Sequence, residues 1–267
     1  MAELGVVITG VTGRMGSALV KGVRDTKGLV LAGATERPGS TAVGLDAGLA
    51  AHLGMLEVSV EDSLQAALTP RANVVIDFTS PEASLRHAAA CAAARVPLVV
   101  GSTGFTEAHK AELLVHAKSV AIVMSPNMSV GVNLMIAAAA QLAARLGEAF
   151  EVEIVEAHHR NKKDAPSGTA LRLAEEIAKA RGLPRSVIRT AREGQVGERS
   201  RQEIGVATVR GGDVVGEHTV FYLGDGERLE LSHRASSREQ FVRGALRAAA
   251  WAVGKPPGLY GMTDVLA

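Results

Sequence analysis

One stretch of the sequence, residues 156–169, gathers the side chains best suited to bind and protonate a small anion. Two histidines, an arginine and two lysines lie within the six residues 158–163. The lysines and the arginine supply positive charge, and a histidine near its reference pKa of about 6.5 can give or take a proton at neutral pH. These residue types suit a small dianion better than a polymer.

A helix is expected to begin directly after this cationic run. Asp164, Pro166, Ser167 and Gly168 precede apolar residues at helical spacing, namely Ala170, Leu171, Leu173, Ala174 and Ile177. The first amides of that helix would point back at the cations, and the glycine would let a ligand approach the backbone. The alternative is a solvated charged face, which is the usual role of such runs. The order of cations, N-cap and glycine favours a binding site.

Composition and charge limit the kind of protein. The chain has 267 residues, of which 47% are hydrophobic and 3% aromatic, so Ala, Val, Leu and Ile must form its core. Its net charge is +1, and we expect no nucleic-acid partner because there is no basic excess to neutralise phosphates. No signal-peptide core or uninterrupted bilayer-spanning apolar run is recognised, so we expect a soluble, cytoplasmic protein without a membrane partner. No Cys/His cluster has metal-ligand spacing, so we expect no metal, and the single Cys91 is expected to pack as a small hydrophobe.

The N-terminal segment has the order strand, glycine turn, helix. The apolar run Gly5–Thr9 predicts a buried parallel strand, and residues 10–16 have the spacing Gly-x-x-Gly-x-x-Gly rather than Gly-x-Gly-x-x-Gly. A second predicted strand, Leu29–Thr35, ends in Glu36 and Arg37. An acid at this place can bind the ribose hydroxyls of adenosine, and an adjacent arginine can bind a 2′-phosphate. Glycine spacing alone is weak, but the combination predicts a site for NADH or NADPH.

Three further strand and helix units follow, with strands expected at 73–78, 97–101 and 120–125. This alternation predicts a doubly wound α/β sheet. Strand ends in such a sheet face the ligand crevice, so two of the following turns should line the nicotinamide side. Their residues are Gly101, Ser102, Thr103, Ser125, Pro126, Asn127 and Met128. Taken singly, each turn could equally be an ordinary helix cap.

The pattern changes after an alanine-rich helix expected at residues 132–146. The elements expected next are a strand at 150–157, a helix at 168–181, strands at 203–210, 214–223 and 228–236, and a final helix from about 239 to 253. The glycine-rich sequences 211–213 and 224–227 are typical of turns and predict antiparallel pairing among the last three strands. The sequence therefore predicts a second domain of α+β type.

The block Glu156–Ala170, EAHHRNKKDAPSGTA, resembles the signature of the 4-hydroxy-tetrahydrodipicolinate reductase (dihydrodipicolinate reductase) family. Other matching motifs follow the family's order along essentially the whole chain: residues 10–16, 36–37, 77–79, 101–105, 127–133, 211–218 and 233–237. The resemblance implies an α/β fold with a Rossmann-type dinucleotide-binding domain at 1–127 and a substrate-binding and tetramerisation domain at 128–238. It also implies that residues 239–267 return to the first domain, and that the protein is a homotetramer.

The resemblance further implies a reaction in lysine and diaminopimelate biosynthesis. Hydride passes from NADH or NADPH to a cyclic imine dicarboxylate, 4-hydroxy-tetrahydrodipicolinate, with loss of water. The resemblance implies that His158 is the proton donor and acceptor and that Lys162 is a second proton donor. It also implies that His159 binds substrate and that the amides of Gly168 and Thr169 hold a carboxylate. The implied cofactor positions are Gly10, Val11, Thr12, Gly13, Arg14, Met15, Glu36, Arg37, Gly101, Ser102, Thr103, Ser125, Pro126, Asn127 and Met128.

Two rival functions keep part of this pattern. A non-catalytic dinucleotide sensor needs the glycine turn and Glu36 but no proton donor, and another reductase on the same fold, of homoserine or aspartate-semialdehyde type, needs a different pocket. Met128 stands where the family often has an aromatic residue, so stacking on the nicotinamide is in question. Among the other histidines, we expect His87, His109 and His116 on helix surfaces, and His218 and His233 in strands that could support the site.

Overall fold

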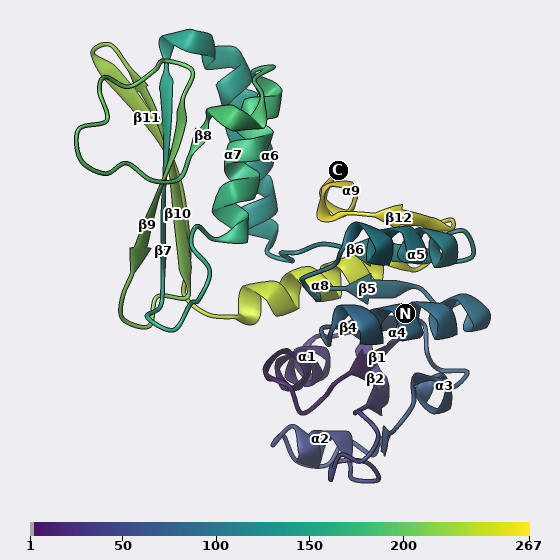
Figure 1. Ribbon diagram of the computed structural model, residues 1–267. Helices are drawn as coiled ribbons and strands as arrows, with labels where there is room; N and C mark the ends of the chain where they lie inside the picture. The colour runs from purple at the N-terminus through teal and green to yellow at the C-terminus, as the bar shows by residue number, and fades with distance from the viewer. Residues whose placement is uncertain (1–2) are drawn as a thin grey trace. The chain divides into compact units, whose positions relative to one another are not determined.

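Residues 3–267 are described by a computed structural model, in which the chain divides into two units (Figure 1). The first unit comprises the chain up to Val130 together with Glu239–Ala267. The second unit is Gly131–Arg238. The chain thus leaves the first unit once and returns to it for its last segment.

A seven-stranded parallel sheet forms the centre of the first unit. In spatial order its strands are β12 (Gly258–Tyr260), β6 (Ala121–Met124), β5 (Leu98–Val100), β4 (Val74–Asp77), β1 (Leu4–Thr9), β2 (Leu29–Thr35) and β3 (Val60–Glu61). The order of strands reverses between β1 and β4. In open α/β sheets, ligands bind beyond the carboxyl ends of the strands at such a switch point.

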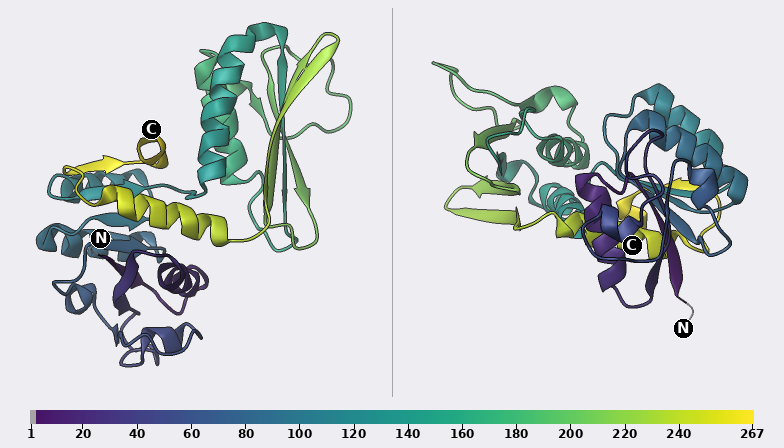
Figure 2. Two further views of the ribbon diagram at one scale, coloured as in Figure 1. Left: turned by 180° about the vertical axis from the view of Figure 1, so that it is seen from behind. Right: turned by 90° about the horizontal axis from the view of Figure 1, so that it is seen from below.

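Helices cover both faces of this sheet (Figures 1 and 2). On one face α1 (Arg14–Asp25) and α8 (Glu239–Ala252) share a core with Val6 and Ile8. On the other face Val7 packs in a second core with residues from α3 (Leu64–Ala67), α4 (Pro81–Ala94) and α5 (Glu107–Ala117). Successive residues of β1 alternate between the two cores, as expected for a strand buried on both faces. The predicted doubly wound α/β architecture is therefore confirmed.

Several short elements of the first unit were not predicted from the sequence. They are β3, β12, α3 and α9 (Met262–Leu266), whereas α2 (Ala47–Ala50) lies in the glycine-rich segment 38–61, whose pattern favours loop and short helix. β12 lies parallel to β6 at the edge of the sheet, with Leu259 paired with Ile122. Two- and three-residue strands show too little alternation to be recognised, and only the neighbouring strand defines them.

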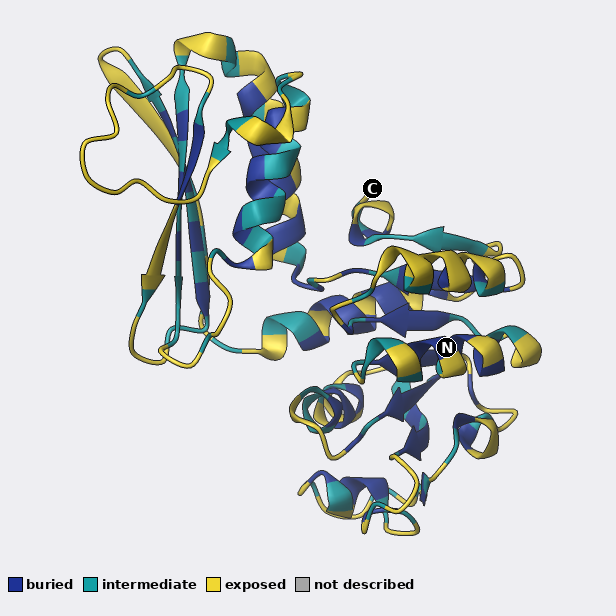
Figure 3. Cartoon of the chain, in the orientation of Figure 1, coloured by how far each residue is buried: buried dark blue, intermediate teal, exposed yellow. Residues whose placement is uncertain are grey.

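The second unit is built on a five-stranded sheet. Its spatial order is β11 (Glu227–Ala235), β10 (Gly216–Gly224), β7 (Glu151–His158), β9 (Ile204–Arg210) and β8 (Ile188–Arg189). One face is covered by α6 (Val130–Leu146) and α7 (Gly168–Ala180), whose inner sides are buried with the central strands (Figure 3). Short 3-10 helices lie at Gly147–Ala149 and Arg185–Val187. This unit has the α+β character that the sequence predicts.

The predicted antiparallel pairing of the last three strands is wrong for one pair. β10 and β11 form a hairpin, but β7 lies between β10 and β9, and β9 runs parallel to β7. The glycine segment at 211–213 passes the end of β7, where Gly211 N donates a hydrogen bond to His158 O at 3.0 Å. A glycine turn signals a change of direction without specifying the partner, and β7 gains pairing on both edges by taking the central place.

The helical segment Val130–Ala149 has the length and composition of a membrane span, with a mean hydropathy of 1.4, although Asn133, Gln141 and Arg145 interrupt its apolar run. Its residues Val132, Ile136 and Ala139 are buried in the core of the second unit. Core helices of globular domains pass the same test, so a single helix of this kind is weak evidence for a membrane span.

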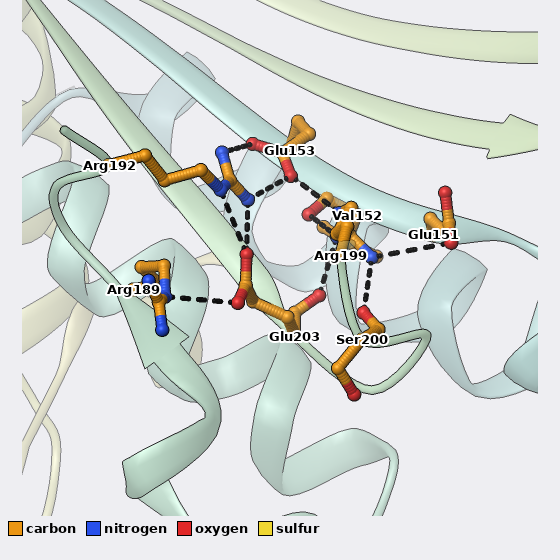
Figure 4. A network of polar contacts seen from close by, with 8 residues as sticks. All are labelled: Glu151, Val152, Glu153, Arg189, Arg192, Arg199, Ser200 and Glu203. Atoms are coloured by element: carbon orange, nitrogen blue, oxygen red, sulfur yellow. Dashed lines mark hydrogen bonds and ion pairs between the residues drawn. The ribbon is translucent and has the colours of Figure 1, made fainter. Parts of the chain in front are cut away.

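The other face of the second sheet carries a network of arginines and glutamates (Figure 4). Arg192 contacts both Glu153 on β7 and Glu203 beside β9, and Arg199 donates to Glu153 Oε1 at 2.8 Å. Glu153 precedes the core residue Ile154 and therefore points to the opposite face. These contacts tie the exposed segment 190–202 to the sheet, and in the described residues no helix covers this face.

Candidate active site

Toward the carboxyl end of β7, the helix-covered face of the second sheet changes from apolar to polar. The apolar row contains Ile154 between Val220 and Val206. Because alternate residues of a strand share a face, the next rows on this face begin two residues further along β7. They are, from β11 to β9, His233, His218, Glu156 and Thr208, and then His158 with Arg210. The strand that builds the core thus also positions the polar cluster.

Glu156 is the centre of this cluster and is fully buried. Its Oε2 lies 2.6 Å from His158 Nδ1, and the guanidinium of Arg210 donates to both carboxylate oxygens at 2.8 Å. Oε1 also accepts the backbone N–H of Ser167 at 3.0 Å and the hydroxyl of Thr208 at 3.1 Å. Burial alone would raise the pKa of Glu156, but the hydrogen bonds from Arg210, His158 and Ser167 outweigh it and lower this pKa to about 2.

Two imidazoles meet in the same cluster. The rings of His158 and His218 lie edge to face, with centroids 5.2 Å apart, and His218 Nε2 is 3.1 Å from Ser167 Oγ. Burial, with a contribution from the neighbouring His158, lowers the pKa of His218 to about 4, so this ring is neutral at pH 7. Burial also lowers the pKa of His158; Glu156 opposes this shift, whereas Lys162 adds to it.

Helix α7 begins at this cluster. Ser167 is its N-cap, and the Ser167 hydroxyl accepts the backbone N–H of Ala170 at 3.2 Å. Gly168 and Thr169 form the start of the first turn, where backbone N–H groups point out of the helix end. No atom lies within 4 Å of the place that a Cβ on Gly168 would occupy. The helix end is therefore sterically open to an anion.

The loop between β7 and α7 carries the remaining predicted residues. Lys162 Nζ lies 2.9 Å from Asp164 Oδ1, and the Lys162 side chain is 21% exposed. His159 follows the end of β7, and its buried Nδ1 has no hydrogen-bond partner within residues 3–267. The structure therefore joins His158 to the start of α7 through Glu156, and it leaves Lys162 with donor hydrogens beyond its ion pair that a ligand could use.

The first unit has a cavity of about 820 Å³ beyond the carboxyl ends of β1, β2 and β4. Five of the predicted cofactor residues line it: Gly10, Thr12, Gly13, Glu36 and Arg37. Residues 62–65 and 78–80, Arg86 and His87 are among the other lining residues. Its size is in the usual range of cofactor sites, about 300–1,000 Å³.

The glycine turn has the geometry that a pyrophosphate site requires. Gly10 has φ +66, and a Cβ on Gly16 would lie 2.0 Å from Gly10 O, so both positions need glycine. Gly13 is the N-cap of α1 and gives it no side-chain cap, so the helix end can receive an anion. The turn therefore fits a dinucleotide.

Glu36 stands beside this turn with its carboxylate already oriented. Glu36 Oε2 accepts the Thr12 hydroxyl at 2.6 Å and the Thr12 backbone N–H at 3.2 Å, and Oε1 accepts Arg37 N at 2.9 Å. Burial would raise the pKa of Glu36, but these hydrogen bonds lower it overall. An ionised carboxylate at the end of β2 can accept hydrogen bonds from ribose hydroxyls.

The other predicted cofactor residues do not line this cavity. Arg14 and Met15 lie in the first turn of α1, and residues 101–103 and 125–128 follow β5 and β6 at the same edge of the sheet. The side chains of Val11 and Met128 are buried in the core of the unit, at 0% and 1% exposure. Met128 therefore does not supply the aromatic residue's stacking surface.

His87 was predicted to lie on a helix surface, and this is wrong. His87 Nδ1 lies 3.0 Å from Oδ2 of the buried Asp77, and the His87 side chain is only 17% exposed. Asp77 Oδ1 also accepts the Thr79 hydroxyl at 2.6 Å. The helical pattern showed where His87 sits along α4 but not that a buried carboxylate at the end of β4 faces it.

Comparison with known proteins now decides the family. The model of the dihydrodipicolinate reductase N-terminus matches residues 4–128, and that of the dihydrodipicolinate reductase C-terminus matches residues 131–266. The chain belongs to the dihydrodipicolinate reductase family. Proteins of this family are oxidoreductases of lysine and diaminopimelate biosynthesis, and the Rossmann-type unit here is the site of a nicotinamide cofactor.

Individual relatives of the dihydrodipicolinate reductase family match this chain over nearly their full length. The chain is 60% identical to the 4-hydroxy-tetrahydrodipicolinate reductase of Myxococcus xanthus, over 97% of this chain and 96% of the relative. It is 58% identical to that of Anaeromyxobacter dehalogenans, over 98% and 97%. The dipicolinate-bound dihydrodipicolinate reductase of a Paenisporosarcina species superposes with a TM-score of 0.80 and 25% identity, over 99% and 100% of the two chains.

Sequence reasoning missed the residues that hold the predicted catalytic histidine in place. In the sequence, Glu156 stands at the start of the cationic block with no role predicted for it, and Thr208 and Arg210 are only part of a predicted strand. Thr208 and Arg210 lie 52 and 54 residues from Glu156 in the chain. The sequence contains one signal for these partners. The alternation of the strand assigns Glu156 to the core face, and a buried carboxylate requires hydrogen-bond donors.

Proposed function

We propose that the protein reduces 4-hydroxy-tetrahydrodipicolinate to tetrahydrodipicolinate with NADH or NADPH and with loss of water. The observation that carries this proposal is the buried Glu156, which joins the imidazole of His158 to the capped start of α7, in a chain that matches the family from end to end. Overall, the reaction removes the ring hydroxyl group and one ring hydrogen as water and adds a hydride and a proton to the ring. The protein must therefore bind a dicarboxylate and handle protons.

The second unit would bind the substrate. A carboxylate fits the start of α7, where the amides of Gly168 and Thr169 and the helix dipole favour negative charge. His159, at the start of the loop between β7 and α7, would also bind the substrate. His158 would donate and accept the proton, and Lys162 would act as a second proton donor and stabilise charge that develops on the ring.

The first unit would bind the dinucleotide, whose nicotinamide supplies the hydride. The backbone of Gly10–Met15 and the start of α1 would hold the pyrophosphate, and Glu36 the ribose hydroxyls. Arg37 would pair with a 2′-phosphate, so the site would accept both NADH and NADPH. Gly101–Thr103 and Ser125–Met128 would lie along the nicotinamide side.

We further propose a cytoplasmic homotetramer whose subunits meet through the second unit. The face of its sheet opposite α6 and α7 carries no helix in the described residues, and Val209 on this face is 51% exposed. Exposed apolar groups on an uncovered sheet face favour association with another subunit. Sedimentation of the purified chain would measure the number of subunits.

A coupled assay tests the proposed function directly. The unstable substrate is generated from pyruvate and aspartate semialdehyde by a synthase, and the oxidation of NADH and of NADPH is followed separately. Turnover with either cofactor supports the proposal. Dinucleotide binding without turnover would indicate the rival sensor, and oxidation of NADH or NADPH with aspartate semialdehyde alone, without pyruvate and the synthase, would indicate another reductase.

A further inference from the structure

We propose that Glu156 is a positioning residue that holds His158 with its proton on Nδ1, so that Nε2 is the nitrogen that exchanges a proton with the substrate. This inference rests on the proposed function for the identity of the reaction. The tautomer itself follows from the contacts of Glu156 and can be measured without substrate.

The carboxylate of Glu156 determines which nitrogen of His158 carries the proton. An ionised carboxylate has only acceptor sites, and every group around Glu156 faces it as a donor: the guanidinium of Arg210, the hydroxyl of Thr208 and the amide of Ser167. A His158 Nδ1 at 2.6 Å must therefore carry a proton. This separation is at the short end for an N–H···O contact, as in charge-assisted hydrogen bonds. In neutral His158, the basic nitrogen is then Nε2.

Proton exchange with the substrate requires that the Nε2 edge of the His158 ring be accessible. Gly216 on β10 lies against this edge of the ring, and a Cβ there would be 3.0 Å from Nε2 and 3.3 Å from Cδ2. Any other residue would crowd the nitrogen. With glycine at this position, the edge of the ring opposite Glu156 keeps the room that proton transfer requires. The side chain of His158 is 11% exposed, so part of the ring is reachable while most of it is covered.

Hydrogen bonds hold the carboxylate of Glu156 rigidly in place. Arg210 holds both oxygens of Glu156, and Ser167 donates its amide to Glu156 while its hydroxyl caps α7. One carboxylate therefore sets both the ring of His158 and the start of the helix that we assign to a substrate carboxylate. A misplacement of either group by about 1 Å is enough to lower a rate by two orders of magnitude.

The charges around His158 determine the sign of the expected pH effect. The titratable or charged groups that face it are Glu156 on its own strand, Arg210 on β9, His218 on β10 and Lys162 on the following loop. Glu156 is the one among them that raises the pKa of His158. Glu156→Gln should therefore lower this pKa further. The alkaline limb of kcat, which reports protonated His158, should move to lower pH.

The experiment combines nuclear magnetic resonance with kinetics on the full chain. In protein labelled with 15N-histidine, the signal assigned to His158 by its loss in His158→Ala should show Nδ1–H and an unprotonated Nε2 at high pH. In Glu156→Gln, kcat should fall on the order of 10- to 100-fold, which is part of the 10²–10⁴ that general acid catalysis contributes. The alkaline limb should shift, while NADH affinity stays unchanged.

The matched control is Glu153→Gln. Glu153 lies on the same strand and is paired with arginines, but it faces the opposite side of the sheet (Figure 4). This variant should keep the wild-type pH profile even if its melting temperature falls. An Nε2–H tautomer in the wild type, or an unmoved alkaline limb in folded Glu156→Gln, would overturn the inference. Absence of reductase activity in the wild type would instead refute the proposed function, and the tautomer would still be measured.

Discussion

Replacement of Arg210 by methionine tests how far the buried carboxylate of Glu156 depends on its guanidinium partner. Methionine keeps most of the apolar stem and removes the two hydrogen bonds of 2.8 Å to Glu156. The two further hydrogen bonds of 2.7 Å that Arg210 donates go to the carbonyl oxygens of the exposed Val209 and Asp164, which water can satisfy in the variant. Hydrogen bonds to charged groups contribute about 1.5–3 kcal/mol each. Because three other donors remain and Arg210 is 20% exposed, we expect the lower part of the summed range, a loss of about 3 kcal/mol in the free energy of unfolding at pH 7.

The pH dependence of this loss follows from the pKa of Glu156, which is lowered from its ordinary 4.5 to about 2. A carboxyl group with a lowered pKa in the folded state stabilises the protein fully above the unfolded-state value, and this contribution is lost as the pH falls toward the folded-state value. A shift of this size corresponds to about 3 kcal/mol. In Arg210→Met the pKa of Glu156 should lie closer to 4.5, so the stability gap between the two proteins should narrow from pH 5 to pH 2.

Urea unfolding followed by circular dichroism at several pH values measures both effects. Arg192→Met is the control, because Arg192 pairs with Glu153 and Glu203 on the other face of the sheet and its side chain is 35% exposed. Partly exposed pairs contribute about 1 kcal/mol or less, so this variant should lose much less stability. A loss below that of the control, or a gap that stays constant as the pH falls, would show that Arg210 does not hold Glu156 in its ionised state.

Three further predictions concern function. His158→Ala and Lys162→Ala should each lower turnover about 10²- to 10⁴-fold with little change in NADH binding, because we propose that both side chains transfer protons; near-normal turnover would remove that residue's role. Arg37→Ala should raise the dissociation constant of NADPH more than that of NADH, measured by fluorescence titration, and equal effects would exclude contact with the 2′-phosphate. Gly16→Ala should weaken binding of both dinucleotides, because its Cβ would lie 2.0 Å from the carbonyl oxygen of Gly10; unchanged binding would show that the turn can move.

The sequence was sufficient for the features that depend on local pattern. The glycine turn, the parallel strands with polar ends and the strand, loop and helix around residues 156–169 could all be read from alternation and spacing. These features give the doubly wound sheet and the start of α7 at Gly168. Each depends on neighbours a few residues away, which is the range over which backbone propensities act.

The features that the sequence could not give depend on partners far along the chain. β7 takes the central place between β10 and β9, and Glu156 finds Arg210 only through that pairing. His87 is paired with the buried Asp77 at the end of β4, whereas the sequence pattern predicts a surface position for it. In each case the local pattern was correct, and tertiary contacts decided what the side chain meets.

The return of the chain to its first unit has a consequence for how this architecture can be divided. The outgoing and incoming segments are joined within that unit: Ser129 Oγ lies 3.4 Å from Gln240 Oε1, and Gly244 is needed because a Cβ there would lie 1.7 Å from Met128 O. Residues 131–238 thus behave as a large insertion whose two ends are anchored at neighbouring points. A short glycine and serine linker could replace them and leave a minimal nucleotide-binding module. Deletion of α8 and α9, by contrast, would remove part of that module's own core.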